Sequence, residues 1–234
     1  MFLHAHPDDE TLATGALIAG LIAQGHSVAV VTATRGERGE VMPGPLAALS
    51  GAQLVAQREC ELRRALADLG VTQRAWLGTA PARVPGRPQR RYLDSGMRWV
   101  TETVAGPAAD AGPESLSLAP IEEPAADLSA FLSAFGADVL ISYDELGDYG
   151  HPDHLACHHI AKAAAGNVGF VEIVSEPRVG LPGVVVVEHG EQLVRLRRAL
   201  AGYPSQFRLD GPDVIHVGGQ RQPITTSCRL RRVE

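Results

Sequence analysis

Lysine is almost absent from this sequence. Lys162 is the only lysine in 234 residues, although lysine and arginine together number 21. Chemistry through a lysine Schiff base therefore has one candidate, which lies in a helical pattern without signs of a pocket. The net charge is −6 and no long basic run occurs. The sequence thus lacks the clustered positive charge of a nucleic-acid-binding surface, and we expect no nucleic-acid partner.

Cysteine and long apolar runs are also scarce. The three cysteines show no C-x-x-C spacing, which argues against a disulfide framework and against a thiolate zinc site. They are Cys60, Cys157 and Cys228. No apolar run reaches transmembrane length, and the first residues lack the features of a signal peptide. We expect a cytoplasmic protein without membrane association, and a homo-oligomer is compatible with the sequence.

Short apolar runs alternate with helical patterns along the chain. Residues 27–33 and 138–143 are continuous apolar runs, typical of strands in a parallel sheet that is covered on both faces. The order predicts one α/β domain over residues 1–234, with a Rossmann-like, open, mostly parallel sheet and helices on both faces. Two short strands after residue 213 would form a small C-terminal β extension. Further strands are expected at 1–5, 74–77 and 184–188, and helices at 11–24, 52–69, 125–135, 154–165 and 190–202.

Two stretches interrupt this regular pattern. Residues 78–96 contain too much proline, glycine and arginine for regular structure, and residues 105–123 have the composition of a mobile or loosely ordered segment. Loops of this length inside a domain are usually functional or disordered. We therefore expect residues 78–123 to be irregular and to form substrate loops.

The residues that carry chemistry fall into two short motifs. Residues 6–10 read His-Pro-Asp-Asp-Glu, and residues 151–154 read His-Pro-Asp-His. The first motif follows the strand expected at 1–5, and the second follows the strand expected at 138–143. Ligands of parallel α/β sheets bind outside the carboxyl ends of the strands. We therefore expect the two motifs to form one site at that edge.

The two motifs together suit a metal ion. Helix capping explains one or two acidic residues at a helix start, but not a histidine, a proline and three acids together. A hydrolytic zinc ion needs three protein ligands and an open position for water, which two histidines and one carboxylate would supply. The same donor set also suits iron(II). By spacing alone His158 is a rival ligand, because it lies four residues after His154 on the same helix face.

These motifs resemble those of the LmbE/PIG-L-like N-deacetylase family, whose members hydrolyse N-acetyl groups on glucosamine-containing compounds. The family pattern A-H-P-D-D-E stands at residues 5–10, and its H-P-D-H pattern stands at residues 151–154. The mycothiol-pathway branch of the family, which acts on N-acetylglucosaminyl-inositol, is the most similar. The segments that carry this closer resemblance are 34–40, 58–62, 94–97 and 149–150.

The resemblance implies the metal ligands and the catalytic base. It implies zinc ligation by His6, Asp9 and His154, and it makes Asp8 the general base. Zinc lowers the pKa of bound water to about 7 and polarises a carbonyl group. A general base is typically worth ~10²–10⁴ in rate. These roles together would allow hydrolysis of an amide, which is a poor electrophile.

The resemblance also implies roles around the metal. It places His151 and Tyr149 where the oxyanion forms, and it gives Arg58 and Asp94 contacts with hydroxyl groups of the sugar or inositol. Asp153 has two interpretations. It could bind a histidine and fix its tautomer in the second coordination sphere, or it could cap the helix that begins nearby.

We therefore predict the zinc-dependent removal of an N-acetyl group from a small molecule containing N-acetylglucosamine. Its substrate would be N-acetylglucosaminyl-inositol, a related pseudodisaccharide or a natural-product amino sugar. A mycothiol-conjugate amidase is the alternative within the family. A metal-dependent phosphoesterase would need a second metal or a phosphate cradle, and no Gly-rich P-loop is present. A non-catalytic sugar-binding protein would not need the complete motifs.

Overall fold

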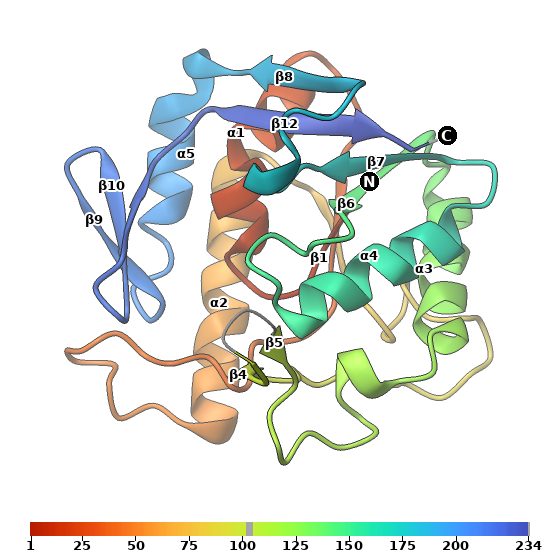
Figure 1. The fold of residues 1–234 in the computed structure, drawn as a ribbon, viewed down its shortest axis with the longest axis horizontal. Helices are drawn as coiled ribbons and strands as arrows, with labels where there is room; N and C mark the ends of the chain where they lie inside the picture. Colours follow the sequence, from red (N-terminus) through yellow and green to blue (C-terminus); the bar gives the residue numbers. More distant parts are fainter. Residues whose placement is uncertain (102–104, 234) are drawn as a thin grey trace.

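A seven-stranded sheet forms the centre of the molecule, in the order β3-β2-β1-β6-β7-β12-β8 (Figure 1). The computed structural model describes residues 1–101 and 105–233. β1, β2, β3, β6 and β7 run parallel, whereas β12 is antiparallel to both of its neighbours. The expected open, mostly parallel sheet is confirmed. Its strands are β1 (Phe2–His4), β2 (Ala29–Thr32), β3 (Gln73–Trp76), β6 (Val139–Tyr143), β7 (Gly169–Ile173), β8 (Val184–Glu188) and β12 (Ser227–Arg232).

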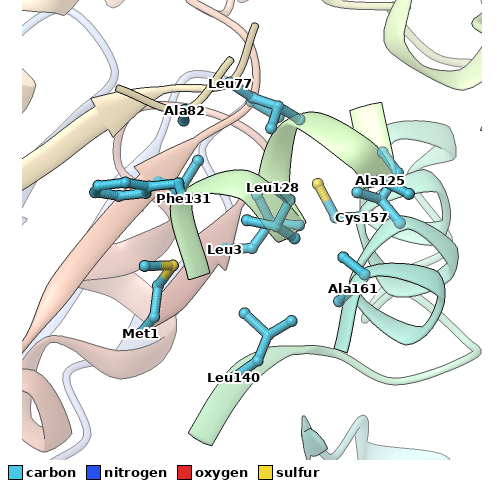
Figure 2. Close-up of a cluster of buried hydrophobic side chains, with 14 of the residues drawn as sticks. Met1, Leu3, Leu77, Ala82, Ala125, Leu128, Phe131, Leu140, Cys157 and Ala161 are labelled. Atoms are coloured by element: carbon cyan, nitrogen blue, oxygen red, sulfur yellow. The ribbon is translucent and has the colours of Figure 1, made fainter. Parts of the chain in front are cut away.

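Helices cover both faces of this sheet, as expected. They are α1 (Asp9–Ala23), α2 (Gly51–Leu69), α3 (Glu122–Phe135), α4 (Pro152–Ala165) and α5 (Leu193–Leu200). Successive residues of a strand point to opposite faces. Phe2 of β1 therefore packs in the apolar cluster with α1, α2 and α5, while Leu3 packs in the cluster with α3 and α4. Figure 2 shows Leu3 in this second cluster, close to Leu128 of α3 and to Cys157 of α4.

The C-terminal part contains more strands than the sequence pattern predicted. Strands β9 (Phe207–Asp210), β10 (Asp213–His216) and β11 (Arg221–Pro223) form a small antiparallel sheet, which is the expected β extension. The prediction of two short strands after residue 213 was incomplete, because β12 follows and inserts into the central sheet between β7 and β8. Cys228 and Leu230 alternate as the buried residues of β12. Because most residues of β12 are polar, the alternation of its buried residues is a weak sequence signal for a strand.

The segment between β3 and α3 carries little regular structure in its described part. Its regular elements are β4 (Arg98–Trp99), β5 (Ala105–Gly106) and the 3-10 turn η1 (Leu116–Leu118). Part of it is nevertheless packed firmly. Leu116 and Tyr92 are buried in the cluster with α3 and α4, and Leu93 pairs with Ser115 in an isolated bridge. The expectation of a loosely ordered segment at 105–123 therefore does not hold around η1.

The strand order reverses between β1 and β6. From β1 the chain moves outward to β2 and β3, and it then returns to β6 on the other side of β1. Residues 6–10 follow β1, and residues 151–154 lie where α4 begins, after β6. Ligands of open α/β sheets bind at such a switch point. Among the described residues, no helix has the length and apolar character needed to span a membrane.

Candidate active site

The first motif turns sharply from β1 into α1. Asp8 caps the start of α1 with φ 107° and ψ −34°, and the described residues include one other non-glycine residue with positive φ, Asp148. Such a backbone costs on the order of 1–3 kcal/mol and occurs mainly at functional sites. Helix α1 begins at Asp9, two residues before the predicted start. The carboxylate of Asp9 therefore lies in the first helical turn, where the helix dipole favours it.

Ligand atoms from the two motifs meet at the Asp9 carboxylate. Asp9 Oδ2 lies 3.2 Å from His6 Nδ1 and 3.3 Å from His154 Nε2. The same oxygen accepts hydrogen bonds from the His6 backbone N–H at 2.9 Å and from the Tyr143 hydroxyl at 2.7 Å. His6 and His154 are both buried. The structure thus brings together the three residues that were predicted as metal ligands.

The far nitrogen of each histidine already has a partner. His6 Nε2 lies 3.1 Å from Asp153 Oδ2, and His154 Nδ1 lies 3.2 Å from the carbonyl oxygen of Gly147. These oxygens only accept, so the ring protons of the neutral histidines belong on those two nitrogens. Lone pairs on His6 Nδ1 and His154 Nε2 then face the negative oxygen of Asp9. His154 Nε2 is buried without a hydrogen-bond partner.

This arrangement of donors fits a metal ion. Two lone pairs and a carboxylate oxygen at close range repel one another unless a cation or a proton lies between them. Histidine nitrogen with carboxylate oxygen is a donor set that both zinc and iron(II) accept. Burial acts to lower the pKa of His6, but Asp94, Asp153 and Asp9 outweigh it and raise this pKa well above its usual value. The cluster therefore attracts positive charge.

His151 begins the second motif as the N-cap of α4. Its Nδ1 accepts a hydrogen bond from the Asp153 backbone N–H at 3.1 Å, so the ring proton belongs on Nε2. Burial, together with His6 and His154, lowers the pKa of His151 to about 3. The ring is therefore a neutral donor. The ligand atoms of His6, His151 and His154 also lie within 4.8 Å of one another. Because His151 Nδ1 accepts a hydrogen bond and its Nε2 carries the ring proton, this neutral ring has no free lone pair for a metal, which favours Asp9 as the third ligand.

Asp8 is a buried titratable carboxyl beside the cluster. Burial raises the pKa of its carboxyl to about 8, with Arg58 acting in the opposite direction and Asp9 and Glu10 adding to the rise. A catalytic base works best when its pKa lies near the working pH. Asp8 Oδ2 lies 3.3 Å from Arg58 Nη2.

Asp94 and Tyr149 border the cluster. Asp94 Oδ1 lies 3.7 Å from His6 Nε2 and accepts the Gly96 backbone N–H at 2.8 Å. Tyr149 is 55% exposed, and its ring centroid lies 5.2 Å from that of His154 and 6.0 Å from that of His151. An exposed tyrosine beside buried histidines forms the rim of the site.

Arg58 lies differently from the expectation of a substrate-binding residue. It is 3% exposed, and both of its terminal nitrogens contact the protein. Nη2 donates to the carbonyl oxygen of Pro7, and Nη1 donates to that of Gly36. The Arg58 side chain therefore contacts the backbone of the first motif and of the loop after β2.

The sequence pattern missed Tyr143 and Ser95 as supporting residues, and it left open whether His158 is a metal ligand. Tyr143 stacks on His154 with ring centroids 4.1 Å apart, and its place at the end of β6 was the available signal. Ser95 donates to Asp153 through its backbone N–H at 2.9 Å and through its hydroxyl. His158 lies outside the cluster, because its Nδ1 is 3.0 Å from the Tyr143 carbonyl oxygen and its ring packs near Phe170.

Fold and site together define an α/β protein with a buried histidine–carboxylate cluster at the switch point of a parallel sheet. The chain belongs to the PIG-L family, described as GlcNAc-PI de-N-acetylase, whose model matches residues 1–165. The family expected from the sequence is confirmed. A relative from Actinosynnema mirum, 1D-myo-inositol 2-acetamido-2-deoxy-alpha-D-glucopyranoside deacetylase, is 41% identical over 175 residues, which are 74% of this chain and 56% of the relative. The chain spans about half the length of the first such relatives.

Solved structures share the fold at low sequence identity. The zinc-inhibited form of teicoplanin deacetylase Orf2 has a TM-score of 0.61 and 21% identity, covering 100% of this chain and 98% of that one. GalB, the 4-carboxy-2-hydroxymuconate hydratase of Pseudomonas putida KT2440, has a TM-score of 0.62 and 15% identity, covering 100% of this chain and 95% of that one. The fold therefore accommodates more than one reaction, and the reaction has to be inferred from the site.

Proposed function

We propose that this protein is a zinc-dependent N-deacetylase that acts on a small molecule containing N-acetylglucosamine. The convergence of His6 Nδ1 and His154 Nε2 on the Asp9 carboxylate supports this proposal most directly. Asp8 and His151 add a base and a neutral donor beside that cluster. The relatives that are about 40% identical are deacetylases of an N-acetylglucosaminyl-inositol, which favours an amide substrate over a phosphate ester.

Each residue of the site has a separate role in the hydrolysis of the amide. His6, Asp9 and His154 would hold the zinc ion, which when bound activates water and polarises the carbonyl group. Asp8 takes the proton from the attacking water and later passes it to the leaving amine. His151 Nε2–H donates to the carbonyl oxygen as negative charge develops there, and the Tyr149 ring lies at the rim, 6.0 Å from that of His151. A donor of this kind is worth ~10²–10³ in rate.

The substrate is bound around Asp94 and the irregular segment that contains it. The Asp94 carboxylate is an acceptor beside His6 and would bind a sugar hydroxyl near the reacting amide. We place the substrate loops within residues 78–123, which carry little regular structure in their described part. N-acetylglucosaminyl-inositol and related pseudodisaccharides are the first candidates.

Acetate release with defined metal content tests this function. The zinc-loaded and iron(II)-loaded proteins would each be assayed with N-acetylglucosaminyl-inositol, simpler N-acetylglucosaminides and a mycothiol S-conjugate. We expect the zinc-loaded protein to release acetate from the first substrate. Asp8→Asn should lower kcat by ~10²–10⁴, while Asp68→Asn, which changes a half-buried carboxylate paired with Arg198 away from the cluster, should leave it unchanged. Cleavage of the S-conjugate releases a free amine and no acetate, so it would be followed by the amine; cleavage of this substrate alone would identify an amidase. Normal turnover by Asp8→Asn would refute the role of Asp8.

A further inference from the structure

Arg58 reaches from α2 to the backbone beneath the first motif. Its Nη2 donates to the Pro7 carbonyl oxygen at 2.8 Å and lies 3.3 Å from Asp8 Oδ2. Its Nη1 donates to the carbonyl oxygen of Gly36 at 2.8 Å. One guanidinium group therefore connects the loop after β2 to the backbone and the carboxylate of the proposed base.

Two glycines make room for this guanidinium. A Cβ atom on Gly36 would lie 1.8 Å from Arg58 Nη1, and one on Gly39 would lie 2.5 Å from the same nitrogen. The Nε atom is buried and has no hydrogen-bond partner. Arg58 is thus enclosed by the protein, and its terminal nitrogens face backbone and Asp8.

The peptide bond between Pro7 and Asp8 is held at both ends. Arg58 binds its carbonyl oxygen, and Glu10 Oε2 accepts its N–H at 3.1 Å. Glu10 is itself buried and accepts hydrogen bonds from Thr11 and Tyr203. A backbone with φ 107° at a non-glycine residue persists only where its surroundings fix it. These two contacts fix the orientation of this peptide, and with it the direction of the Asp8 side chain.

We infer that Arg58 is a positioning residue that holds Asp8 in its working orientation, instead of a contact for substrate hydroxyls. The inference rests on the proposed role of Asp8 as general base. A group that binds the substrate equally in the ground state and the transition state changes KM, whereas a group that orients the base changes kcat. The two roles of Arg58 therefore predict different kinetics.

Steady-state kinetics of Arg58 variants separates the two roles. We expect Arg58→Ala to lower kcat by ~10²-fold or more, as a displaced base would, with KM within about twofold. Arg58→Lys should recover about tenfold of that loss, because a lysine keeps one charged donor group but lacks the two terminal nitrogens of the planar guanidinium. Arg64→Ala, on the exposed side of α2, should match the wild type. A rise in KM with unchanged kcat in Arg58→Ala would overturn the inference and restore the substrate contact.

A second variant moves Arg58 without removing it. Gly39→Ala places a methyl group against Nη1, and we expect the same loss in kcat without a change in KM. Crystal structures of Gly39→Ala and of Arg58→Ala add a readout that needs no activity. Asp8 should leave its φ near 107° in both, and an unchanged Asp8 in both would overturn the inference. A wild type without deacetylase activity would refute the proposed function, and the structures would still show whether Arg58 positions Asp8.

Discussion

At the scale of single residues, the two histidines of the cluster owe their orientation to oxygen atoms behind them. Asp153 contacts the far nitrogen of His6, and the Gly147 carbonyl oxygen contacts that of His154. Partners of this kind set the tautomer and raise the basicity of a ligating histidine. Asp153 is fully buried and also binds the backbone N–H and the hydroxyl of Ser95. Of its two interpretations, the structure shows the histidine contact, while His151 is the N-cap.

Removing the charge of Asp153 tests this support. We expect Asp153→Asn to weaken zinc binding by ~10–100-fold, because an amide polarises the His6 ring less than a carboxylate does. Competition with a chromophoric zinc chelator measures the affinity. Asp110→Asn, an exposed carboxylate paired with Arg38, serves as the control and should bind zinc like the wild type. Equal affinity of Asp153→Asn and the wild type would contradict this role.

The sequence predicted the residues of the cluster better than their supports. The two motifs indicated a metal site of histidines and a carboxylate, but the set of His6, Asp9 and His154 came from the resemblance to the family, because spacing alone left His158 as a rival ligand. The contacts of Arg58 and Tyr143 depend on which backbone atoms come close after folding, and no local pattern records that. Sequence motifs therefore do not record such tertiary contacts, and the resemblance placed Arg58 near the substrate, whereas the structure shows it in contact with Pro7, Gly36 and Asp8.

At the scale of elements, the loop between β6 and α4 is tied to the end of β7. Ser175 donates its hydroxyl to Asp144 Oδ1 at 2.6 Å and its backbone N–H to Asp144 Oδ2 at 2.8 Å. The same hydroxyl accepts the Asp148 backbone N–H at 3.0 Å. This loop carries the Gly147 carbonyl that orients His154, so a residue beyond the part matched by the family supports the site.

Loss of the Ser175 hydroxyl should loosen this loop. Ser175→Ala leaves the Asp148 N–H without its acceptor, which typically costs ~1–3 kcal/mol. We expect faster amide hydrogen exchange confined to residues 145–150, together with weaker zinc binding. Ser133→Ala on the exposed side of α3 is the matched control and should leave both unchanged. Wild-type exchange rates at 145–150 in Ser175→Ala would show that other contacts hold the loop.

Strand β7 shows why the elements were predicted only in part. The continuous apolar runs at β2 and β6 were clear, because both faces of these strands are covered. In β7 the buried residues Phe170 and Glu172 alternate with half-buried ones, and a glutamate that pairs with Arg178 and Arg231 occupies an inner position. A short stretch of sequence does not show that a charged residue will be buried when its partners lie on other elements. Strand β7 was therefore missed.

At the scale of the whole molecule, the sheet brings two distant motifs to one place. The chain leaves β1 toward β2 and β3 and returns at β6, so the ends of β1 and β6 are adjacent (Figure 1). Apolar clusters on both faces fix these strands, and the polar cluster lies where the strands end. The order of the elements predicted a mostly parallel sheet with both motifs at one edge, and the observed strand order explains why His6 and His154 meet at Asp9.

Counting metal ions tests the central claim most directly. The protein would be saturated with zinc, freed of excess by gel filtration and analysed by inductively coupled plasma mass spectrometry. We expect one zinc ion per chain in the wild type and almost none in Asp9→Ala, because one of three ligands is lost. His158→Gln, which changes a buried histidine outside the cluster, should retain the ion. Two ions per chain, or full occupancy in Asp9→Ala, would contradict a single site built by His6, Asp9 and His154.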